Sequence, residues 1–343
     1  MTKFIVILGP TSSGKSSLAI KLAKKFNGEI ISADSRQVYK DLDIGTGKVT
    51  KKEQKIVPHH LIDIASPKRQ YSVADFKHDV KSAAAQITNK GKVPFLVGGT
   101  PFYIYAAVDD LQIPKVKPNL KLRKTLEKKS PTELFKMLKK LDPQRAKTID
   151  RHNPRRLIRA LEIIKATGKP VPTLDHPYLT SPIKGEEPVF SFEKRPSSFP
   201  PPPDHGRGRL GGGGVIMIGL NPASKKLRKL IAARVEQRFK QGLLKEVKHM
   251  LSTGIALKRL KQIGLTYALA ADFLARRPGV PKNARSSKKW YSIKKAELIQ
   301  KIKTAEWQFA RRQMTWFNHD QRIHWITSQK QAEKLIKSFL KKY

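Results

Sequence analysis

A glycine-rich stretch near the N-terminus has the residue types and spacing of a phosphate-binding loop. Residues 9–16 fit the pattern G-x-x-x-x-G-K-[ST], follow the apolar run Phe4–Leu8, and precede helically spaced apolar residues in Ser16–Phe26. In such a loop the backbone N–H groups surround a phosphate, and the start of the helix adds positive potential. Lys15 would neutralise phosphate charge and Ser16 would ligate Mg²⁺. The predicted phosphate site consists of Gly9, Pro10, Thr11, Ser12, Ser13, Gly14, Lys15 and Ser16.

A carboxylate and a hydroxyl are expected beside this loop. An ATPase usually carries an acid at the end of a later strand, but Val93–Val97 leads into Gly98-Gly99-Thr100. The acid, Asp34, instead follows the strand predicted at Glu29–Ala33. The carboxyl ends of parallel strands share one edge of a sheet, so Asp34, Thr100 and the loop should meet there. This placement favours Asp34 as a base acting on an acceptor, with a helix cap as the alternative.

The elements that must position these residues alternate between strands and helices. We expect an α/β fold in which a P-loop NTPase-like parallel sheet of about five strands is flanked by helices. Further strands are predicted at Val215–Leu220 and Arg322–Ile326. Further helices are predicted at Val73–Thr88, Ala223–Gln241 and Ile293–Phe317.

Between residues 113 and 194 the strand pattern disappears. Amphipathic Lys-rich stretches at Leu120–Lys128 and Thr132–Leu141, and a further one after Asn153-Pro154, predict a helical insertion domain. Residues 195–214, of which eleven are Pro or Gly, predict a disordered linker. The expected catalytic core therefore comprises residues 1–112 and 215–343.

The charge of the chain is large and uneven. The 343 residues carry a formal charge of +43, and residues 1–112 hold 17 Lys and Arg against 10 Asp and Glu, whereas the remainder holds 53 against 17. Such a field attracts polyanions, above all nucleic acids, although a generally Lys-rich composition is the alternative. The absence of cysteine excludes disulfides and thiolate chemistry. With no apolar segment of membrane-spanning length, we expect a soluble, cytoplasmic protein.

Nine sequence blocks, in order, make the chain similar to the tRNA dimethylallyltransferases, also called tRNA isopentenyltransferases. Together they span about residues 1–180 and 215–330. The blocks are Gly9–Ser16, Ser32–Tyr39, Asp43–Lys48, Pro58–Asp63, Tyr71–Phe76, Val97–Tyr103, Asn153–Glu162, Arg234–Phe239 and Phe309–Phe317.

The resemblance implies a specific reaction. The loop would hold the pyrophosphate of dimethylallyl diphosphate with Mg²⁺, and no ATP would be hydrolysed. The acceptor would be the exocyclic amine of the adenosine 3′ of the anticodon, in tRNAs that read codons beginning with U. The allylic C–O bond breaks and pyrophosphate leaves, so the reaction needs a stabilised leaving group and a positioned acceptor.

The resemblance also implies roles for individual residues. Asp34 would accept the amine proton or orient the amine, and Thr100 would hydrogen-bond the leaving oxygen. Arg238 would join the loop in neutralising pyrophosphate, with Arg234 a weaker candidate. The predicted contacts to tRNA, mainly its anticodon stem-loop, are Asp34, Ser35, Arg36, Gln37, Thr100, Arg123, Arg155, Arg156 and Arg159.

Three further features have competing interpretations. The stretch Lys261–Tyr267 resembles an RNA-contacting segment, but Thr266 and Ala268 are weaker groups than the family pattern predicts. The helical spacing of Trp307, Phe309, Trp316 and Phe317 favours core packing over base stacking. His59 and His60 have no evident third metal ligand, so we interpret them as structural.

Two other functions remain possible from the sequence. A small-molecule kinase using ATP would explain the loop and Asp34, but not the uneven charge or the arginines at 155–159. A nucleic-acid-binding protein with an inactive loop would not need Lys15, Ser16, Asp34 and Thr100. We expect a monomer that binds tRNA and dimethylallyl diphosphate and no membrane.

Overall fold

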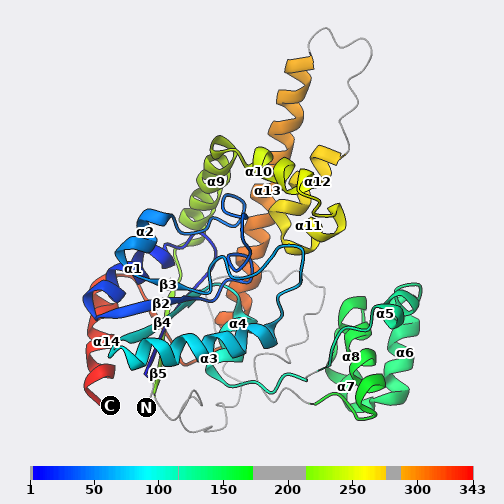
Figure 1. The fold of residues 1–343 in the computed structure, drawn as a ribbon, viewed down its shortest axis with the longest axis horizontal. Coiled ribbons are helices and arrows are strands. Elements are labelled where there is room, and N and C mark those ends of the chain that lie inside the picture. The colour runs from blue at the N-terminus through cyan, green and yellow to red at the C-terminus, as the bar shows by residue number, and fades with distance from the viewer. Residues whose placement is uncertain (1–2, 115, 173–213, 276–286, 343) are drawn as a thin grey trace. The chain divides into compact units, whose positions relative to one another are not determined.

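The computed structural model describes residues 3–114, 116–172, 214–275 and 287–342, and the chain divides into two compact units (Figure 1). One unit comprises Met1–Asp110 and Arg207–Tyr343, and the other comprises Leu111–Gly206. The stretch predicted to be a linker, residues 195–214, lies outside the described residues except for Gly214, whose carbonyl accepts a hydrogen bond from Phe4 N–H. Of the unusually basic stretch 276–292, residues 276–286 also lie outside them.

The first unit is built on a six-stranded parallel sheet, which confirms the predicted fold class. The strand order is β3-β2-β4-β1-β5-β6. The strands are β1 (Phe4–Leu8), β2 (Gly28–Ser32), β3 (His59–His60), β4 (Val93–Gly98), β5 (Val215–Leu220) and β6 (Ile323–Ile326). Five of them lie where the apolar runs predicted strands. The short edge strand β3 was not predicted, because two histidines carry no apolar strand pattern.

The histidines of β3 have structural partners. His60 Nε2 lies 2.7 Å from a carboxylate oxygen of Glu29, and Lys92 donates to the other oxygen at 2.8 Å. Among the described residues no group of three or more His, Asp or Glu side chains is arranged to hold a metal ion.

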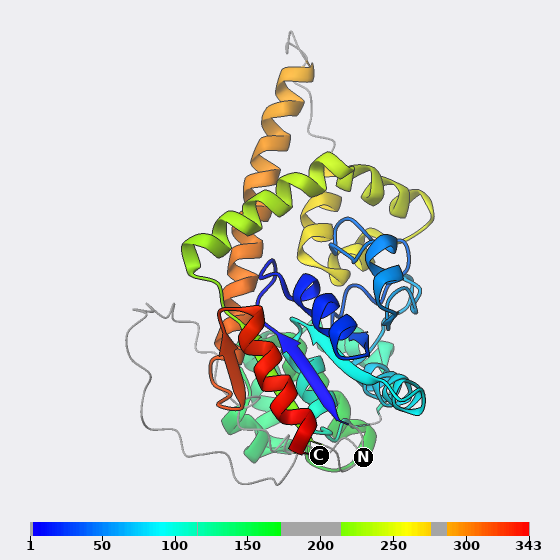
Figure 2. The ribbon, with the colours of Figure 1, turned by 90° about the vertical axis from the view of Figure 1, so that its left-hand side faces the viewer.

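Helices cover both faces of this sheet. Helices α1 (Lys15–Lys25) and α14 (Gln329–Lys342) share one buried apolar cluster with alternate side chains of the strands, and Figure 2 shows both on the same side of the sheet. Helix α3 (Val73–Asn89) packs against β2, β4 and α4 (Pro101–Val108). Because β1 is buried on both faces, its residues form a continuous apolar run rather than an alternating one.

A second apolar core in the same unit joins the loop after β2 to a group of helices. Val38 and Leu42 of that loop pack with residues of these helices, all buried. The helices are α9 (Ser224–Gln241), α10 (Leu243–Ser252), α11 (Leu257–Ile263), α12 (Leu265–Ala275) and α13 (Ser287–Phe317). Helix α2 (Lys51–Ile56) has no buried residue and starts at a capping box formed by Thr50 and Glu53.

The second unit is helical in its described part. Its helices are α5 (Leu120–Leu126), α6 (Pro131–Leu141), α7 (Pro143–Thr148) and α8 (Pro154–Thr167). Leu134 and Leu138 of α6 and Leu157 and Leu161 of α8 are fully buried against one another. Proline at the first position of three of these helices is suited to a helix start, because its missing N–H has no partner there in any case.

The aromatic residues of α13 follow the core prediction only in part. Phe317 is fully buried and Trp307 packs against the second core, but Phe309 is 42% exposed. Core packing was therefore the wrong prediction for Phe309, which lies on the outer face of the helix. No helix in the described ranges is both long and apolar enough to cross a membrane.

Candidate anion-binding and catalytic site

The predicted phosphate loop joins β1 to α1. At Gly9, with φ 145°, an added Cβ would lie 2.4 Å from the carbonyl oxygen of Leu220, so only glycine allows β5 to approach this closely. Ser12 has a φ of 61°, and its buried hydroxyl has no hydrogen-bond partner. No acidic residue stands in the first turn of α1, which leaves the positive end of the helix free to attract an anion.

Lys15 folds back over this loop. Its Nζ donates to the carbonyl oxygen of Pro10 at 2.5 Å and lies 3.5 Å from Ser13 Oγ. Burial, together with repulsion from Arg234, lowers the pKa of Lys15 to about 7, against the attraction of Asp34. With no carboxylate in direct contact, this ammonium is available to an anion held by the loop.

The carboxyl ends of β2 and β4 lie side by side, as predicted. At Gly98 an added Cβ would lie 2.2 Å from the carbonyl oxygen of Ala33, so glycine lets the ends of β4 and β2 touch. This contact brings Thr100 to Ser35, whose backbone N–H donates to Thr100 Oγ1 at 3.2 Å. Thr100 precedes α4 but makes no side-chain cap, so its hydroxyl is directed to Ser35 instead.

Asp34 lies half-buried at the end of β2. One carboxylate oxygen accepts the backbone N–H of Arg36 at 2.9 Å, which fixes the side chain in a tight turn. Its charge acts on both Lys15 and Arg234. The structure therefore brings together the predicted base, the predicted hydroxyl and the cations of the loop.

The two other predicted residues of this segment differ in exposure. Gln37 is buried, and its amide donates to the carbonyl oxygen of Gly47 at 3.4 Å. Its polar atoms are therefore occupied within the protein. Arg36 is exposed and its side chain lies against Gly264, where an added Cβ would come within 3.5 Å of Nε.

Two arginines of α9 lie one helical turn apart and have different partners. Arg234 donates to Thr11 Oγ1 at 3.2 Å and to the carbonyl oxygen of Gly47 at 3.0 Å. Arg238, the stronger candidate from sequence, instead forms a buried ion pair with Glu306 of α13. The structure thus gives the contact with the phosphate loop to Arg234, because Arg238 faces α13.

Arg234 is charged but poorly compensated. Burial, with repulsion from Arg238, lowers its pKa to about 10, while Glu306 and Asp34 act in the opposite direction. It reaches no carboxylate oxygen within ion-pair distance in the described part of the chain. Arg234 and Lys15 thus form a cationic pair at the mouth of the loop.

Gln313 was not predicted as a site residue, although it lies in one of the quoted blocks. Its side-chain oxygen accepts the backbone N–H of Thr11 at 2.8 Å, and its nitrogen donates to the carbonyl oxygen of Gly99 at 2.5 Å. It thus holds the phosphate loop at a fixed position relative to the end of β4. No local sequence signal could reveal these contacts, since Thr11 and Gly99 lie 302 and 214 residues from Gln313 along the chain.

Glu246 of α10 was missed for the same reason. Its carboxylate accepts the backbone N–H groups of Asp43, Ile44 and Gly45 at 2.7–3.0 Å and the hydroxyl of Tyr267 at 2.7 Å. Glu246 therefore anchors the loop that also supplies Gly47, a partner of Arg234.

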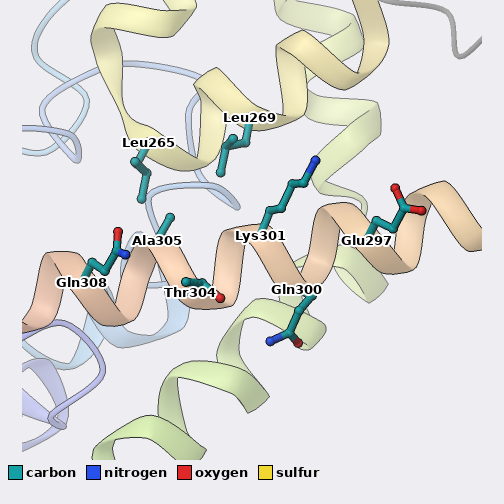
Figure 3. Close-up of a pocket in the computed structure, with 8 residues that line it drawn as sticks. All are labelled: Leu265, Leu269, Glu297, Gln300, Lys301, Thr304, Ala305 and Gln308. Carbon is teal, nitrogen blue, oxygen red and sulfur yellow. The ribbon is translucent and has the colours of Figure 1, made fainter.

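The stretch resembling an RNA-contacting segment borders a groove between α12 and α13 (Figure 3). Leu265 and Leu269 point from α12 toward Ala305 of α13, and Lys301 extends along the same groove. Thr266 is buried and donates to Glu306 at 2.9 Å, so it is absent from the groove. From this stretch, Gly264 lies against Arg36 and Leu265 lines the groove, while Thr266 and Tyr267 are buried.

The predicted RNA-binding arginines of the helical unit fall into two groups. Arg123 and Arg159 both donate to the buried carboxylate of Glu162, Arg123 through two hydrogen bonds of 2.7 and 2.8 Å and Arg159 through one of 2.5 Å. Arg155 and Arg156 are exposed and have no acidic partner in the described part of this unit.

Fold and site together define a phosphate-loop protein of the α/β class, in which a carboxylate and a hydroxyl stand beside a cationic loop at the carboxyl ends of parallel strands. A family model described as "IPP transferase" matches residues 37–320, and one described as "Isopentenyl transferase" matches residues 2–64. This chain belongs to the IPP transferase family.

Individual relatives agree with that assignment. A tRNA dimethylallyltransferase of Halothermothrix orenii is 36% identical over 342 residues, which cover 98% of this chain and 91% of that protein. The structure of a tRNA isopentenylpyrophosphate transferase from Bacillus halodurans is similar with a TM-score of 0.62 at 30% identity, covering 100% and 98% of the two chains. A eukaryotic dimethylallyltransferase acting on tRNA has a TM-score of 0.66 at 26% identity, covering 92% and 70%.

Proposed function

We propose that this chain is a tRNA dimethylallyltransferase that modifies the adenosine 3′ of the anticodon in tRNAs reading codons that begin with U. The observation that carries the proposal is the convergence of the phosphate loop, Asp34, Thr100 and Arg234 at one edge of the sheet. Membership of the IPP transferase family supports the substrate pair, dimethylallyl diphosphate and tRNA.

The loop side of the site serves the leaving group. The diphosphate would bind to the loop N–H groups, Lys15 and Arg234, which stabilise the charge that grows as the allylic C–O bond breaks. Thr100, held by Ser35, would donate to the oxygen that leaves. The bonding electrons go with that oxygen, and pyrophosphate is released.

The strand-β2 side serves the acceptor. The exocyclic nitrogen of the adenosine forms the new C–N bond and loses one proton. Asp34 would accept this proton, and its turn with Arg36 N–H keeps one oxygen occupied while the other remains available. The target base must leave its stack to reach this carboxylate.

The residues present also fit a bound Mg²⁺. This ion favours oxygen ligands and usually takes only one or two from the protein, with phosphate oxygens and water supplying the rest. Ser16 would be the ligand, since its hydroxyl makes no hydrogen bond within the described residues and stands at the first turn of α1. The ion would add positive charge on the leaving diphosphate.

The test is direct. Purified protein is incubated with Mg²⁺, dimethylallyl diphosphate and an unmodified tRNA with adenosines after its anticodon, and the digested RNA is analysed by mass spectrometry. We expect one adenosine to gain a dimethylallyl group, and D34A to lose this activity while remaining folded. Consumption of ATP with phosphorylation of a small hydroxyl compound, and no change in the tRNA, would favour a kinase instead.

A further inference from the structure

Arg145, on helix α7 (Pro143–Thr148) of the helical unit, has no acidic partner within ion-pair distance among the residues that the structure describes. Its guanidinium makes no hydrogen bond within the described residues, and its Nε is buried without a partner. An arginine in this state is costly, because a buried N–H that leaves water normally gains an acceptor elsewhere. The missing partner should be an anion that reaches the protein from outside.

The nearest acid is already committed. Asp142 is 2% exposed, and its two carboxylate oxygens accept backbone N–H groups of Arg145 and Val171 at 2.9 and 2.8 Å. It attracts the Arg145 guanidinium but forms no ion pair with it. Its role is to start α7 and to hold the chain after α8.

No other acid in the described part of this unit forms an ion pair with Arg145 either. Glu133 closes the capping box of α6, Asp150 accepts the N–H of His152, and Glu162 receives Arg123 and Arg159. Arg156, in the first turn of α8, acts on Arg145 by repulsion and is itself exposed. Burial lowers the pKa of Arg145, and the charge of Arg156 lowers it more than the charge of Asp142 raises it.

We propose that Arg145 and Arg156 together bind one phosphate of the RNA backbone. The inference rests on the proposed function, to which it adds a residue, Arg145, and a division of labour among the arginines of this unit. Arg123 and Arg159, neutralised by Glu162, hold α5 and the chain around Val116 against α8, whereas Arg145 and Arg156 make the contact with RNA. Guanidinium groups suit this role because their fork of donors matches phosphate oxygens.

The first experiment measures binding of an unmodified anticodon stem-loop to the full-length protein at several salt concentrations. We expect R145Q and R156Q each to weaken binding about three- to thirtyfold and to lower the salt slope by about one, the value for one lost phosphate contact. Because both residues hold the same phosphate, the double variant should be little weaker than either single variant. K165Q, which removes an exposed cation from the far end of α8, is the matched control and should leave the slope nearly unchanged.

Several outcomes would overturn the proposal. Wild-type binding by R145Q would remove Arg145 from the interface, and simple additivity of R145Q and R156Q would mean two separate phosphates. The R145K variant, which keeps the charge but loses the fork, should bind with intermediate affinity. If R145Q loses affinity for inorganic phosphate but keeps wild-type affinity for the stem-loop, the site binds small anions and not the RNA backbone.

A kinetic arm separates this proposal from the proposed function. In the dimethylallyl-transfer assay, R145Q should raise KM for the stem-loop while leaving kcat and KM for dimethylallyl diphosphate unchanged. If neither the wild type nor any variant transfers the dimethylallyl group, but the variants weaken RNA binding as expected, the proposed function fails and the phosphate site stands. If transfer proceeds and R145Q has a normal KM for RNA, the phosphate site fails alone.

Discussion

Each unit contains a buried glutamate that holds arginine, and the two glutamates differ in how completely their partners are satisfied. In the helical unit, Glu162 is 1% exposed and accepts from Arg123, Arg159 and the backbone N–H of Asn119. In the catalytic unit, Glu306 accepts from Arg238 and Thr266 through one oxygen, while its other oxygen and Arg238 Nε lack partners.

This difference in pairing distinguishes cations that stabilise the fold from cations that are available to bind an anion. Burial opposes the charge of Glu162, but the hydrogen bonds from Arg123, Arg159 and Asn119 together hold its pKa below the ordinary value. Around Glu306 the positive charge exceeds the negative, since Arg238 pairs with it and Arg234 also acts on it, with no ion-pair partner of its own among the described residues. The type of residue is the same in both places, and its role depends on whether packing brings the guanidinium into contact with the buried glutamate.

The largest expected effect on stability follows from removing Glu162, whose carboxylate oxygens both accept hydrogen bonds. E162A leaves two guanidinium groups and the Asn119 N–H without their acceptor, and breaking a buried pair in this way costs about 3–5 kcal/mol. We expect the helical unit to lose hydrogen-exchange protection in α5 and α8 while α1 and α3 keep theirs. E133Q, which changes only a surface capping box and leaves a side chain that can still accept the Ser130 N–H, should leave the protection of α5 and α8 nearly unchanged. Equal loss of protection in both variants would contradict the central role of Glu162.

The next effect concerns the two arginines of α9. R234Q removes a cation that touches the phosphate loop, and losing one such contact to a developing charge costs about 10²–10³-fold in turnover. R238M combined with E306L replaces the buried pair by apolar groups and should be close to neutral in activity. Transfer kinetics with saturating tRNA would measure the turnover of both variants. A larger loss of turnover in R238M/E306L than in R234Q would restore Arg238 as the diphosphate ligand.

The pH dependence of diphosphate binding tests the unpaired state of Lys15. Because the pKa of Lys15 is about 7 without ligand, its charge is present below pH 7 and lost above it. A bound diphosphate favours the charged form, so affinity for dimethylallyl diphosphate should fall about three- to tenfold per pH unit above pH 7. Calorimetric titration at pH 6 to 9 would show this fall and the accompanying proton uptake. K15M should bind weakly with a flatter profile, and an identical profile would exclude Lys15 as the cause.

The smallest effect is expected from E306Q, which keeps the hydrogen bond to Thr266 but removes a negative charge near Arg234. The added net positive charge should strengthen product inhibition by pyrophosphate several-fold, while the free energy of unfolding falls by about 1–3 kcal/mol. E236Q, which breaks an exposed bridge between the same two helices, is the control for a merely structural effect. Unchanged inhibition in E306Q would show that Glu306 does not balance the charge of the site.

The local residues alone predicted much of the catalytic unit. Five strands, the phosphate loop and the positions of Asp34 and Thr100 follow from apolar runs, glycine spacing and the rule that parallel strands end at one edge. These are properties of short stretches, so a linear pattern carries them. The family blocks added the substrates, which no single stretch specifies.

Only the tertiary structure decided which arginines are paired with a buried glutamate and which, among the described residues, have no acidic partner. Arg123, Arg159 and Arg238 carry the same charge in the sequence as Arg145, Arg156 and Arg234. Their partners, Glu162 and Glu306, lie as far as 68 residues away along the chain. An ion pair of that span depends on how helices pack, and burial then fixes whether the charge is neutralised or left for a phosphate. The sequence determined where positive charge is plentiful, and packing determined where it is available.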